Sequence, residues 1–197
     1  MDRPEDAAVD GCTRCPGLVD SRSRIVNGVG PLDADIVFVG EAPGAEEDAQ
    51  GEPFVGRSGE ILDVTLQDHG LDRDRVRITN CVRCRPPDNR DPTAEELANC
   101  LGYLERELRI VDPQVIVTLG KVASEHLLDR SVAVTSEAGS VDRLELDGNG
   151  YPVLVSIHPA AVLYDRSQRE TLETVLERAV SMAGGEERNG QAQLGDF

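Results

Sequence analysis

Lysine, tryptophan and long apolar runs are what this chain of 197 residues has least of. It holds no tryptophan and only 3% aromatic residues, and Lys121 is its single lysine. No apolar run approaches the roughly 18 residues of a membrane span, and the first ten residues (MDRPEDAAVD) are acidic where a signal peptide would be basic. We therefore expect a soluble, cytoplasmic protein without a membrane segment.

Positive charge is scarce as well, since 20 Lys+Arg face 37 Asp+Glu and give a net charge of −17. An acidic, lysine-poor surface is typical of proteins from a salt-rich cytoplasm, as in halophilic archaea, because salt screens self-repulsion. The alternative is an ordinary acidic protein from a GC-rich genome, which favours arginine over lysine. On the halophilic interpretation, we predict that activity rises with KCl before it declines. Global acidity argues against a nucleic-acid partner, although local patches decide.

Short apolar runs rich in β-branched residues punctuate the chain. Four of them predict buried strands, at residues 36–40, 76–79, 115–119 and 153–157. Helical patterns run from Ser58 to about His69, from the capping box at Thr93–Glu96, over Lys121–Leu128 and from a capping box at Ser167–Glu170. This alternation predicts an α/β sandwich with a parallel sheet, which binds ligands beyond the carboxyl ends of its strands. We expect one domain over residues 1–183 and a flexible acidic tail over 184–197.

The five cysteines are expected to be metal ligands or core residues rather than disulfides. Cys12 and Cys15 form a C-x2-C pair, Cys84 and Cys100 stand singly, and Cys81 has no obvious partner. Four thiolates suit either tetrahedral zinc or an iron–sulfur cluster. One C-x2-C pair with two distant cysteines is not the usual zinc-ribbon arrangement. The alternative is that Cys81 and Cys100 pack in the core and the first pair is adventitious.

Two glycine-rich loops follow the first predicted strand. The turn from Gly40 to Gly44 (GEAPG) exposes main-chain N–H groups that can hold an anionic or carbonyl oxygen, unless it is a plain strand–helix connection. The next loop, at residues 51–59 (GEPFVGRSG), carries Phe54 between glycines. A ring held there can stack on a planar ligand, or it can cover the edge of the core.

Polar residues end the second and fourth predicted strands. Asn80 offers a donor and an acceptor, which suits the edge of a nucleobase, although capping is the commoner role of such a residue. His158 enters a turn fixed by proline, where a neutral imidazole can donate to a developing oxyanion or serve a structural role. Arginines surround the second strand, at Arg73, Arg75, Arg77, Arg83, Arg85 and Arg90. This locally basic stretch is the best candidate for a phosphate contact.

The order of these motifs resembles the family 4 uracil-DNA glycosylases. The series is C-x2-C, G-E-A-P-G-x-x-E-D, G-x-P-F-V-G-x-S-G, T-N-x-x-x-C-R-P-P, a single cysteine and H-P, and the match runs from about Cys12 to Val180. The resemblance implies a three-layer α/β/α sandwich with a four-stranded parallel sheet. It also implies a DNA-repair enzyme that flips uracil out of DNA, hydrolyses its N-glycosidic bond and leaves an abasic site.

The resemblance assigns the base-binding residues. Phe54 stacks on the extruded uracil, and Asn80 reads its N3/O4 edge, which separates uracil from cytosine. His158 and the N–H groups of the turn at Gly40, Glu41 and Ala42 stabilise the charge that grows on uracil O2. The proposed roles place three strand ends around one base.

The carboxylates and the DNA contacts follow from the same resemblance. Glu41 or Glu47 holds the water or stabilises the oxocarbenium-like sugar, and Glu47 matches the acidic position that excludes the thymine methyl. Ala42 stands where better-known glycosylases keep an aspartate, so the general base is unassigned. The expected DNA contacts are Arg57, Arg83 and Arg85, with Val162 or Leu163 as the wedge that fills the vacated base space. Tyr164 replaces an arginine of the common H-P-S-x-x-L-R pattern.

A cofactor and partners are implied too. By motif position, Cys12, Cys15, Cys84 and Cys100 match the ligands of one structural [4Fe–4S] cluster, which leaves Cys81 spare. The implied partner is uracil-containing DNA, single- or double-stranded. We expect a monomer with no membrane contact, and a sliding clamp is a candidate partner.

Two other functions fit parts of the pattern. A catalytically silent module would bind uracil-containing DNA tightly without releasing the base. An iron–sulfur electron carrier would suit the acidic surface. That last interpretation leaves Phe54, Asn80 and His158, at successive strand ends, unexplained.

Overall fold

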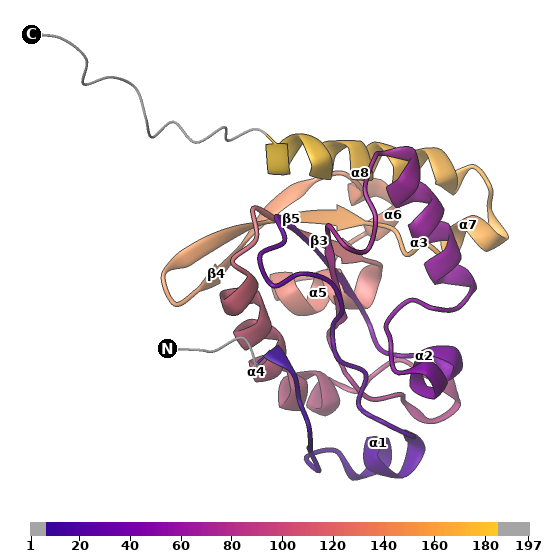
Figure 1. Cartoon of the computed structure of the whole chain (residues 1–197), viewed down its shortest axis with the longest axis vertical. Coiled ribbons are helices and arrows are strands. Elements are labelled where there is room, and N and C mark those ends of the chain that lie inside the picture. Colours follow the sequence, from indigo (N-terminus) through magenta and orange to yellow (C-terminus); the bar gives the residue numbers. More distant parts are fainter. Residues whose placement is uncertain (1–6, 185–197) are drawn as a thin grey trace, which may run out of the picture.

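A computed structural model describes residues 7–184 (Figure 1). Five strands form one sheet in the order β2-β1-β3-β5-β4. The strands are β1 (Ile36–Gly40), β2 (Arg77–Asn80), β3 (Val115–Leu119), β4 (Val141–Leu146) and β5 (Asn149–Ser156). All neighbours pair in parallel except β4 and β5, which form an antiparallel hairpin at one edge. The predicted four parallel strands are confirmed, and β4 adds a fifth.

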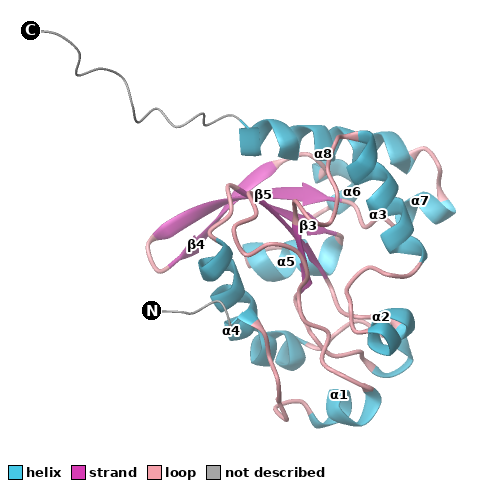
Figure 2. Ribbon diagram, in the orientation of Figure 1, coloured by secondary structure: helices cyan, strands magenta, loops and turns pink. Residues whose placement is uncertain are grey.

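Helices cover both faces of the sheet, as Figure 2 shows. The longer ones are α3 (Arg57–Asp68), α4 (Ala94–Val111), α5 (Lys121–Leu128) and α8 (Gln168–Gly184). The short ones are α1 (Pro16–Ser21), α2 (Ala45–Gln50), the 3-10 turn η2 (Pro87–Asn89), α6 (Val134–Glu137) and α7 (Ala161–Tyr164). No helix within residues 7–184 is long and apolar enough to cross a membrane.

An apolar core lies on each face of the sheet, between the sheet and the helices that cover that face. On one face, Leu62 and Leu66 of α3 and Leu176 of α8 pack against the sheet. On the other face, Leu104 of α4 and Leu127 of α5 do so. The predicted α/β/α sandwich is therefore confirmed. The predicted tail at 184–197 lies outside the described residues except for Gly184.

The start of α4 follows its predicted capping box. The Thr93 hydroxyl accepts from the Glu96 main-chain N–H at 3.2 Å, and the Glu96 carboxylate accepts from the Thr93 N–H at 2.8 Å. Two N–H groups that lack intrahelical partners are satisfied in this way. The cap fixes where the 18-residue helix begins, and with it the position of Cys100 about two turns later.

Candidate functional site

The carboxyl ends of three parallel strands meet around a pocket that is open to solvent. The lining residues are Ala42, Gly44, Glu47, Phe54, Ser58, Asn80 and His158. The fold thus brings together residues from four separate sequence motifs, as the strand-end argument predicted.

Close packing at the floor of the pocket requires a glycine at the end of β1. A side chain on Gly40 would collide with the Asn80 amide oxygen and with the Phe54 ring. Gly40 pairs with Asn80 in the sheet register, so the two strand ends lie side by side. Asn80 is only 3% exposed yet lines the pocket. The absence of a side chain at residue 40 is what lets ring and amide share the floor.

Phe54 occupies a backbone conformation that must be held in place. Its φ is +55°, in the left-handed region that non-glycine residues seldom adopt. Gly59 supports this turn, because a Cβ there would collide with the Phe54 carbonyl. The Phe54 ring is 5% exposed and stacks against His158, with ring centroids 5.6 Å apart at 27°.

A carboxylate and a guanidinium bind the main chain of the Phe54 loop, the first at its N–H groups and the second at its carbonyl groups. Glu47 accepts from the N–H groups of Val55 at 3.2 Å and Gly56 at 3.1 Å with one oxygen, and from Gly44 at 3.1 Å with the other. Arg73 donates to the carbonyl of Pro53 at 2.9 Å and to that of Phe54.

Arg73 is held in turn by α3. Its Nε donates to Asp63 at 2.7 Å. Sequence inspection placed Arg73 in a basic stretch suited to phosphate and missed its role in the loop. Arg73 stands between Asp72 and Asp74 in a charged stretch before β2, and its main-chain partners are not visible in any motif.

His158 is presented as a neutral hydrogen-bond donor. Its Nδ1 accepts from the Ala160 N–H at 3.1 Å, so a neutral ring carries its proton on Nε2. Burial lowers the pKa of His158, while the nearby Glu47 charge acts in the opposite direction. Gly120, with φ +100°, approaches within 3.1 Å of the His158 Cβ if given a Cβ of its own, so it too leaves room for the ring.

Glu41 stands between Gly40 and Ala42 in the chain, but only Ala42 of these three lines the pocket. Burial, reinforced by the charge of Asp91, raises the pKa of Glu41 to about 7. The charge of Glu41 in turn contributes to the raised pKa of Cys81, whose main cause is burial. A carboxyl that titrates near neutrality beside a pocket is a common feature of functional sites.

The four cysteines expected to hold a cluster line one small cavity. Its walls are Cys12, Arg14, Cys15, Leu18, Arg22, Val82, Cys84, Glu96, Asn99 and Cys100. Cys84 accepts from Arg22 at 2.8 Å, and Cys15 accepts from Asn99 at 3.5 Å. Cys81 lies elsewhere, in the core against the sheet.

Burial raises the pKa of Cys84 and of Cys100, against the effects of Arg22 and of the Arg83 main-chain N–H respectively. Within residues 7–184, no three His, Cys, Asp or Glu side chains converge closely enough to hold one metal ion. A [4Fe–4S] cluster bonds each cysteine to a different iron, so its ligands surround a cavity instead of meeting at a point. The four thiols fit that requirement.

The expected role of Arg83 as a DNA contact is wrong. Its side chain is buried, and its guanidinium donates to Glu107 at 2.6 Å. Glu107 also accepts from Arg77 at 2.8 Å and from Thr79 at 2.8 Å. Buried charges need such partners, and an arginine buried with them presents no donor to a phosphate.

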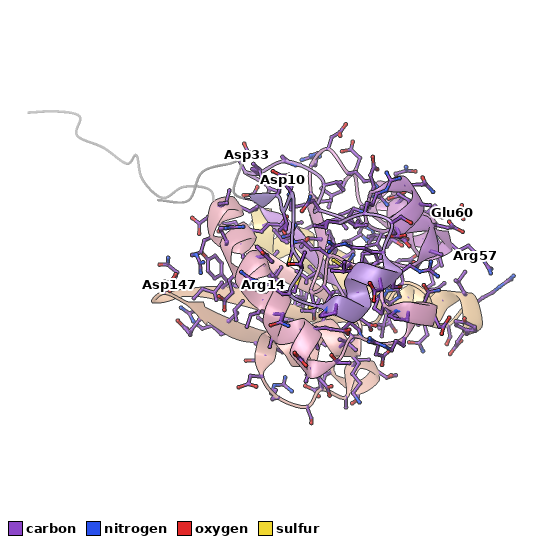
Figure 3. All side chains as sticks on the ribbon, turned by 90° about the horizontal axis from the view of Figure 1, so that it is seen from below. Asp10, Arg14, Asp33, Arg57, Glu60 and Asp147 are labelled. Atoms are coloured by element: carbon purple, nitrogen blue, oxygen red, sulfur yellow. The ribbon has the colours of Figure 1, made fainter. Side chains whose placement is uncertain are left out.

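The other expected DNA contacts lie at the surface. Arg57 is exposed at the start of α3, and Figure 3 shows it on the outside of the molecule. Arg85 is partly buried and donates to Asn89 at 2.7 Å. Val162 and Leu163 lie on α7, which follows the His158 turn, and Leu163 is 38% exposed.

Comparisons with known proteins agree with this geometry. The family model described as the uracil DNA glycosylase superfamily matches residues 27–179. A protein of Archaeoglobus fulgidus named type-4 uracil-DNA glycosylase is 44% identical over 177 residues, covering 88% of each chain. One of the same name from Thermotoga maritima is 44% identical and covers 86% of each chain. A type-5 uracil-DNA glycosylase of Pyrobaculum aerophilum is 33% identical and covers 88% of this chain and 89% of its own.

Proposed function

The chain belongs to the uracil-DNA glycosylase superfamily, and from that premise we propose that it is a type-4 enzyme that excises uracil from DNA. The reaction adds water to C1′ of the sugar and releases uracil, leaving an abasic site. The observation that carries the proposal is the joining of Phe54, Asn80 and His158 in one pocket at the strand ends. The target base has to leave the helical stack to reach such a site.

Base recognition falls to Phe54 and Asn80. The Phe54 ring stacks on the uracil ring, a contact that any planar base makes. The Asn80 amide supplies the selectivity, because it donates to O4 and accepts from N3–H, a pattern that cytosine reverses. Its near-complete burial keeps water from competing for those hydrogen bonds.

His158 stabilises the leaving group. Negative charge grows on uracil O2 as the C1′–N1 bond breaks, and the Nε2–H of neutral His158 donates to it, together with main-chain N–H groups of the Gly40–Ala42 turn. The lowered pKa and the bond from Ala160 to Nδ1 support this role, since both favour the neutral tautomer with Nε2–H. Removing one such donor typically costs about 3 kcal/mol of transition-state stabilisation.

The two carboxylates take different parts. Glu41, next to Ala42 in the chain, holds the attacking water or stabilises the positively charged sugar. Glu47 has both oxygens engaged by main-chain N–H groups, which supports a role in fixing the loop beside the base. Fixed there, Glu47 also crowds the position of a thymine methyl.

We further propose that Cys12, Cys15, Cys84 and Cys100 hold a [4Fe–4S] cluster. When bound, it links the segment before β1, the loop after β2 and α4, a structural contribution that needs no electron transfer. The hydrogen bond from Arg22 to the Cys84 sulfur favours the thiolate at this ligand, against the burial that raises its pKa. Protein with a Cys84→Ser change should lose visible absorbance and iron, whereas Cys81→Ser should keep both. A colourless wild type with one zinc would overturn the assignment.

The decisive experiment is excision from a labelled single-stranded oligonucleotide with one uracil, in molar KCl, followed by alkali to cleave abasic sites. Wild type should cleave, and His158→Ala and Asn80→Ala should lose cleavage while staying folded and cluster-loaded. Tight binding of the oligonucleotide without cleavage by the wild type would favour a silent binding module instead.

We also propose that the protein is a monomer, because one chain supplies the whole pocket. Size-exclusion chromatography tests this proposal.

A further inference from the structure

The side chain of Arg22 joins two of the four cysteines that line the small cavity. Its Nη1 donates to the Cys84 sulfur at 2.8 Å, and its Nη2 donates to the Cys12 carbonyl at 2.7 Å. The planar guanidinium can make both bonds at once, because its donors form a rigid fork. One side chain therefore connects the segment before β1 with the loop after β2.

Helix α1 presents Arg22 to this cavity. The helix begins at another of the four cysteines, because Cys15 is its N-cap and the Cys15 carbonyl accepts from the Leu18 N–H at 3.0 Å. It ends at Arg22, whose own N–H donates to the Leu18 carbonyl at 2.9 Å. Leu18 is 1% exposed and packs in one apolar cluster with Cys84. The short helix thus runs from one cysteine to the guanidinium that binds a second.

The main chain directly after Arg22 is fixed by helix α2. The Ser23 N–H donates to both carboxylate oxygens of Asp48, at 2.8 and 2.9 Å, and Asp48 is 3% exposed. Figure 1 shows α1 and α2 at the same end of the molecule. Arg22 is therefore held by main-chain hydrogen bonds on both sides, so the fold itself sets where its side chain begins.

The charge that faces the sulfurs is positive. Apart from the cysteines, the charged residues that line the cavity are Arg14, Arg22 and Glu96. Glu96 is neutralised by two hydrogen bonds from Arg90, at 2.7 and 2.8 Å, and the Arg14 guanidinium lies over the Tyr103 ring, 4.7 Å from its centroid. Within residues 7–184, the guanidinium of Arg22 donates to the two cysteines and to no carboxylate.

We propose that Arg22 is a positioning residue for the [4Fe–4S] cluster, which fixes Cys84 against the Cys12 segment and balances the charge of the thiolates. The inference rests on the proposed cluster. Four thiolates outweigh the positive charge of an iron–sulfur core, so a cation bonded to one sulfur stabilises the ligated state. Partners of metal ligands commonly change metal affinity about 10–100-fold. Loss of Arg22 should therefore appear first in the retention of iron.

The test compares two arginines that lie two residues apart. Arg22→Met removes the charge and every donor at similar length, and Arg24→Met removes the same charge from an exposed side chain. Iron-loaded protein is placed in excess EDTA and molar KCl, and the loss of visible absorbance is followed beside circular dichroism. Arg22→Met should bleach about tenfold faster than wild type before any loss of helix signal. Arg24→Met should bleach at the wild-type rate. Equal rates for wild type and Arg22→Met, or equal acceleration in both variants, would overturn the proposal.

A spectroscopic signature separates a bond to the cluster ligand from a general effect on the fold. The N–H bond from Arg22 draws electron density from the Cys84 sulfur and so weakens its bond to iron. Arg22→Met should therefore raise the frequency of an Fe–S(Cys) stretching band in the resonance Raman spectrum, and Arg24→Met should not. An unchanged spectrum in Arg22→Met would contradict the proposal.

Arg22→Lys keeps the inference testable if Arg22→Met takes up no cluster. Lysine retains the charge but lacks the planar fork that reaches the sulfur and the carbonyl together. Its bleaching rate should exceed that of wild type and stay below that of Arg22→Met wherever both variants load. A wild-type rate in Arg22→Lys would show that the double hydrogen bond contributes nothing, and would overturn the positioning role.

The outcomes separate this inference from the cluster proposal on which it rests. A wild type that holds zinc or no metal would remove the cluster, whatever the variants do. An iron-loaded wild type with unchanged bleaching and spectrum in Arg22→Met would remove the role of Arg22 alone. Neither result depends on uracil excision, which is measured separately.

Discussion

The guanidinium of Arg73 donates to the main-chain carbonyl of Phe54, 19 residues earlier in the chain. The same guanidinium reaches the carbonyl of Pro53, and Glu47 takes the N–H groups on the other side of the turn. Phe54 thus keeps a positive φ that would otherwise relax. Two charged side chains that hold the main chain of this loop thus set the position of the ring that we propose stacks on the base.

Arg73→Gln should therefore reduce excision while leaving the fold intact. A displacement of the ring by about 1 Å is enough to lower kcat/KM about 100-fold. Arg75→Gln is the matched control, because Arg75 is exposed and donates only to the Gly70 carbonyl. Single-turnover excision by both variants, with circular dichroism as the fold check, measures the effect. Wild-type excision rates in Arg73→Gln would show that the Phe54 loop keeps its conformation without Arg73.

Glu47 should behave as a loop-fixing residue and not as a general base. Glu47→Gln keeps one carbonyl oxygen for the N–H groups of Val55 and Gly56, so excision should stay within about tenfold of wild type, whereas loss of a general base costs about 100-fold or more. Glu47→Ala removes every acceptor and should fall much further. The measurement is the excision rate of each variant on uracil and on thymine substrates. If Glu47→Gln and Glu47→Ala lost nearly the same amount of uracil excision, this role would be contradicted.

Glu41 should make stability depend on pH. Its pKa is raised to about 7 in the folded protein from 4.5, so the folded state binds the proton more tightly than the unfolded state. Stability therefore falls as pH rises from about 4.5 to 7 and then levels, and no penalty exists where both states are protonated. Glu41→Gln removes the titration, so its melting temperature should exceed that of wild type more at pH 8 than at pH 5. If the difference in melting temperature between Glu41→Gln and wild type were equal at pH 5 and pH 8, the raised pKa of Glu41 would be refuted.

Much of the fold follows from local pattern, and the parts that do not have identifiable causes. Buried parallel strands are continuous β-branched runs, so β1, β2, β3 and β5 were predicted. Strand β4 alternates exposed and less exposed residues at the sheet edge and carries three charges, so it has no such run. Its pairing with β5 becomes visible only in three dimensions.

In the site, too, some residues could be identified from sequence motifs, and others only from their contacts in the structure. Asn80 ends β2 and His158 follows β5, where position marks them, whereas Phe54 lies in the loop between α2 and α3, where its flanking glycines mark it. Arg83 was misjudged because charge along the sequence says nothing of burial, and its partner Glu107 lies 24 residues away on α4. The role of Arg73 in the loop was equally invisible in the sequence, because its partners Pro53 and Phe54 lie 20 and 19 residues away.

The buried network around Glu107 should be a major determinant of stability. Glu107 is fully buried and pairs with Arg77 at 2.7 Å and Arg83 at 2.6 Å. Glu107→Gln leaves two buried guanidinium groups without a counter-charge, and breaking a buried pair in this way costs about 3–5 kcal/mol. Urea unfolding in molar KCl measures the change. A loss below about 1 kcal/mol, the usual value for surface pairs, would show that the network contributes no more than those do.

Arg57 and Arg83 should differ in their effect on DNA binding, although sequence inspection assigned both the same expected role. Removing one phosphate contact lowers the slope of log K against log salt by about one. Arg57→Gln should lower that slope, because its side chain is exposed. Arg83→Met should leave the slope unchanged in the folded fraction, because Arg83 is 1% exposed and engaged with Glu107. The measurement is fluorescence anisotropy of a labelled oligonucleotide over a series of KCl concentrations, on protein whose folded fraction is known from circular dichroism. A lower slope for Arg83→Met would mean that the ion network opens when DNA binds.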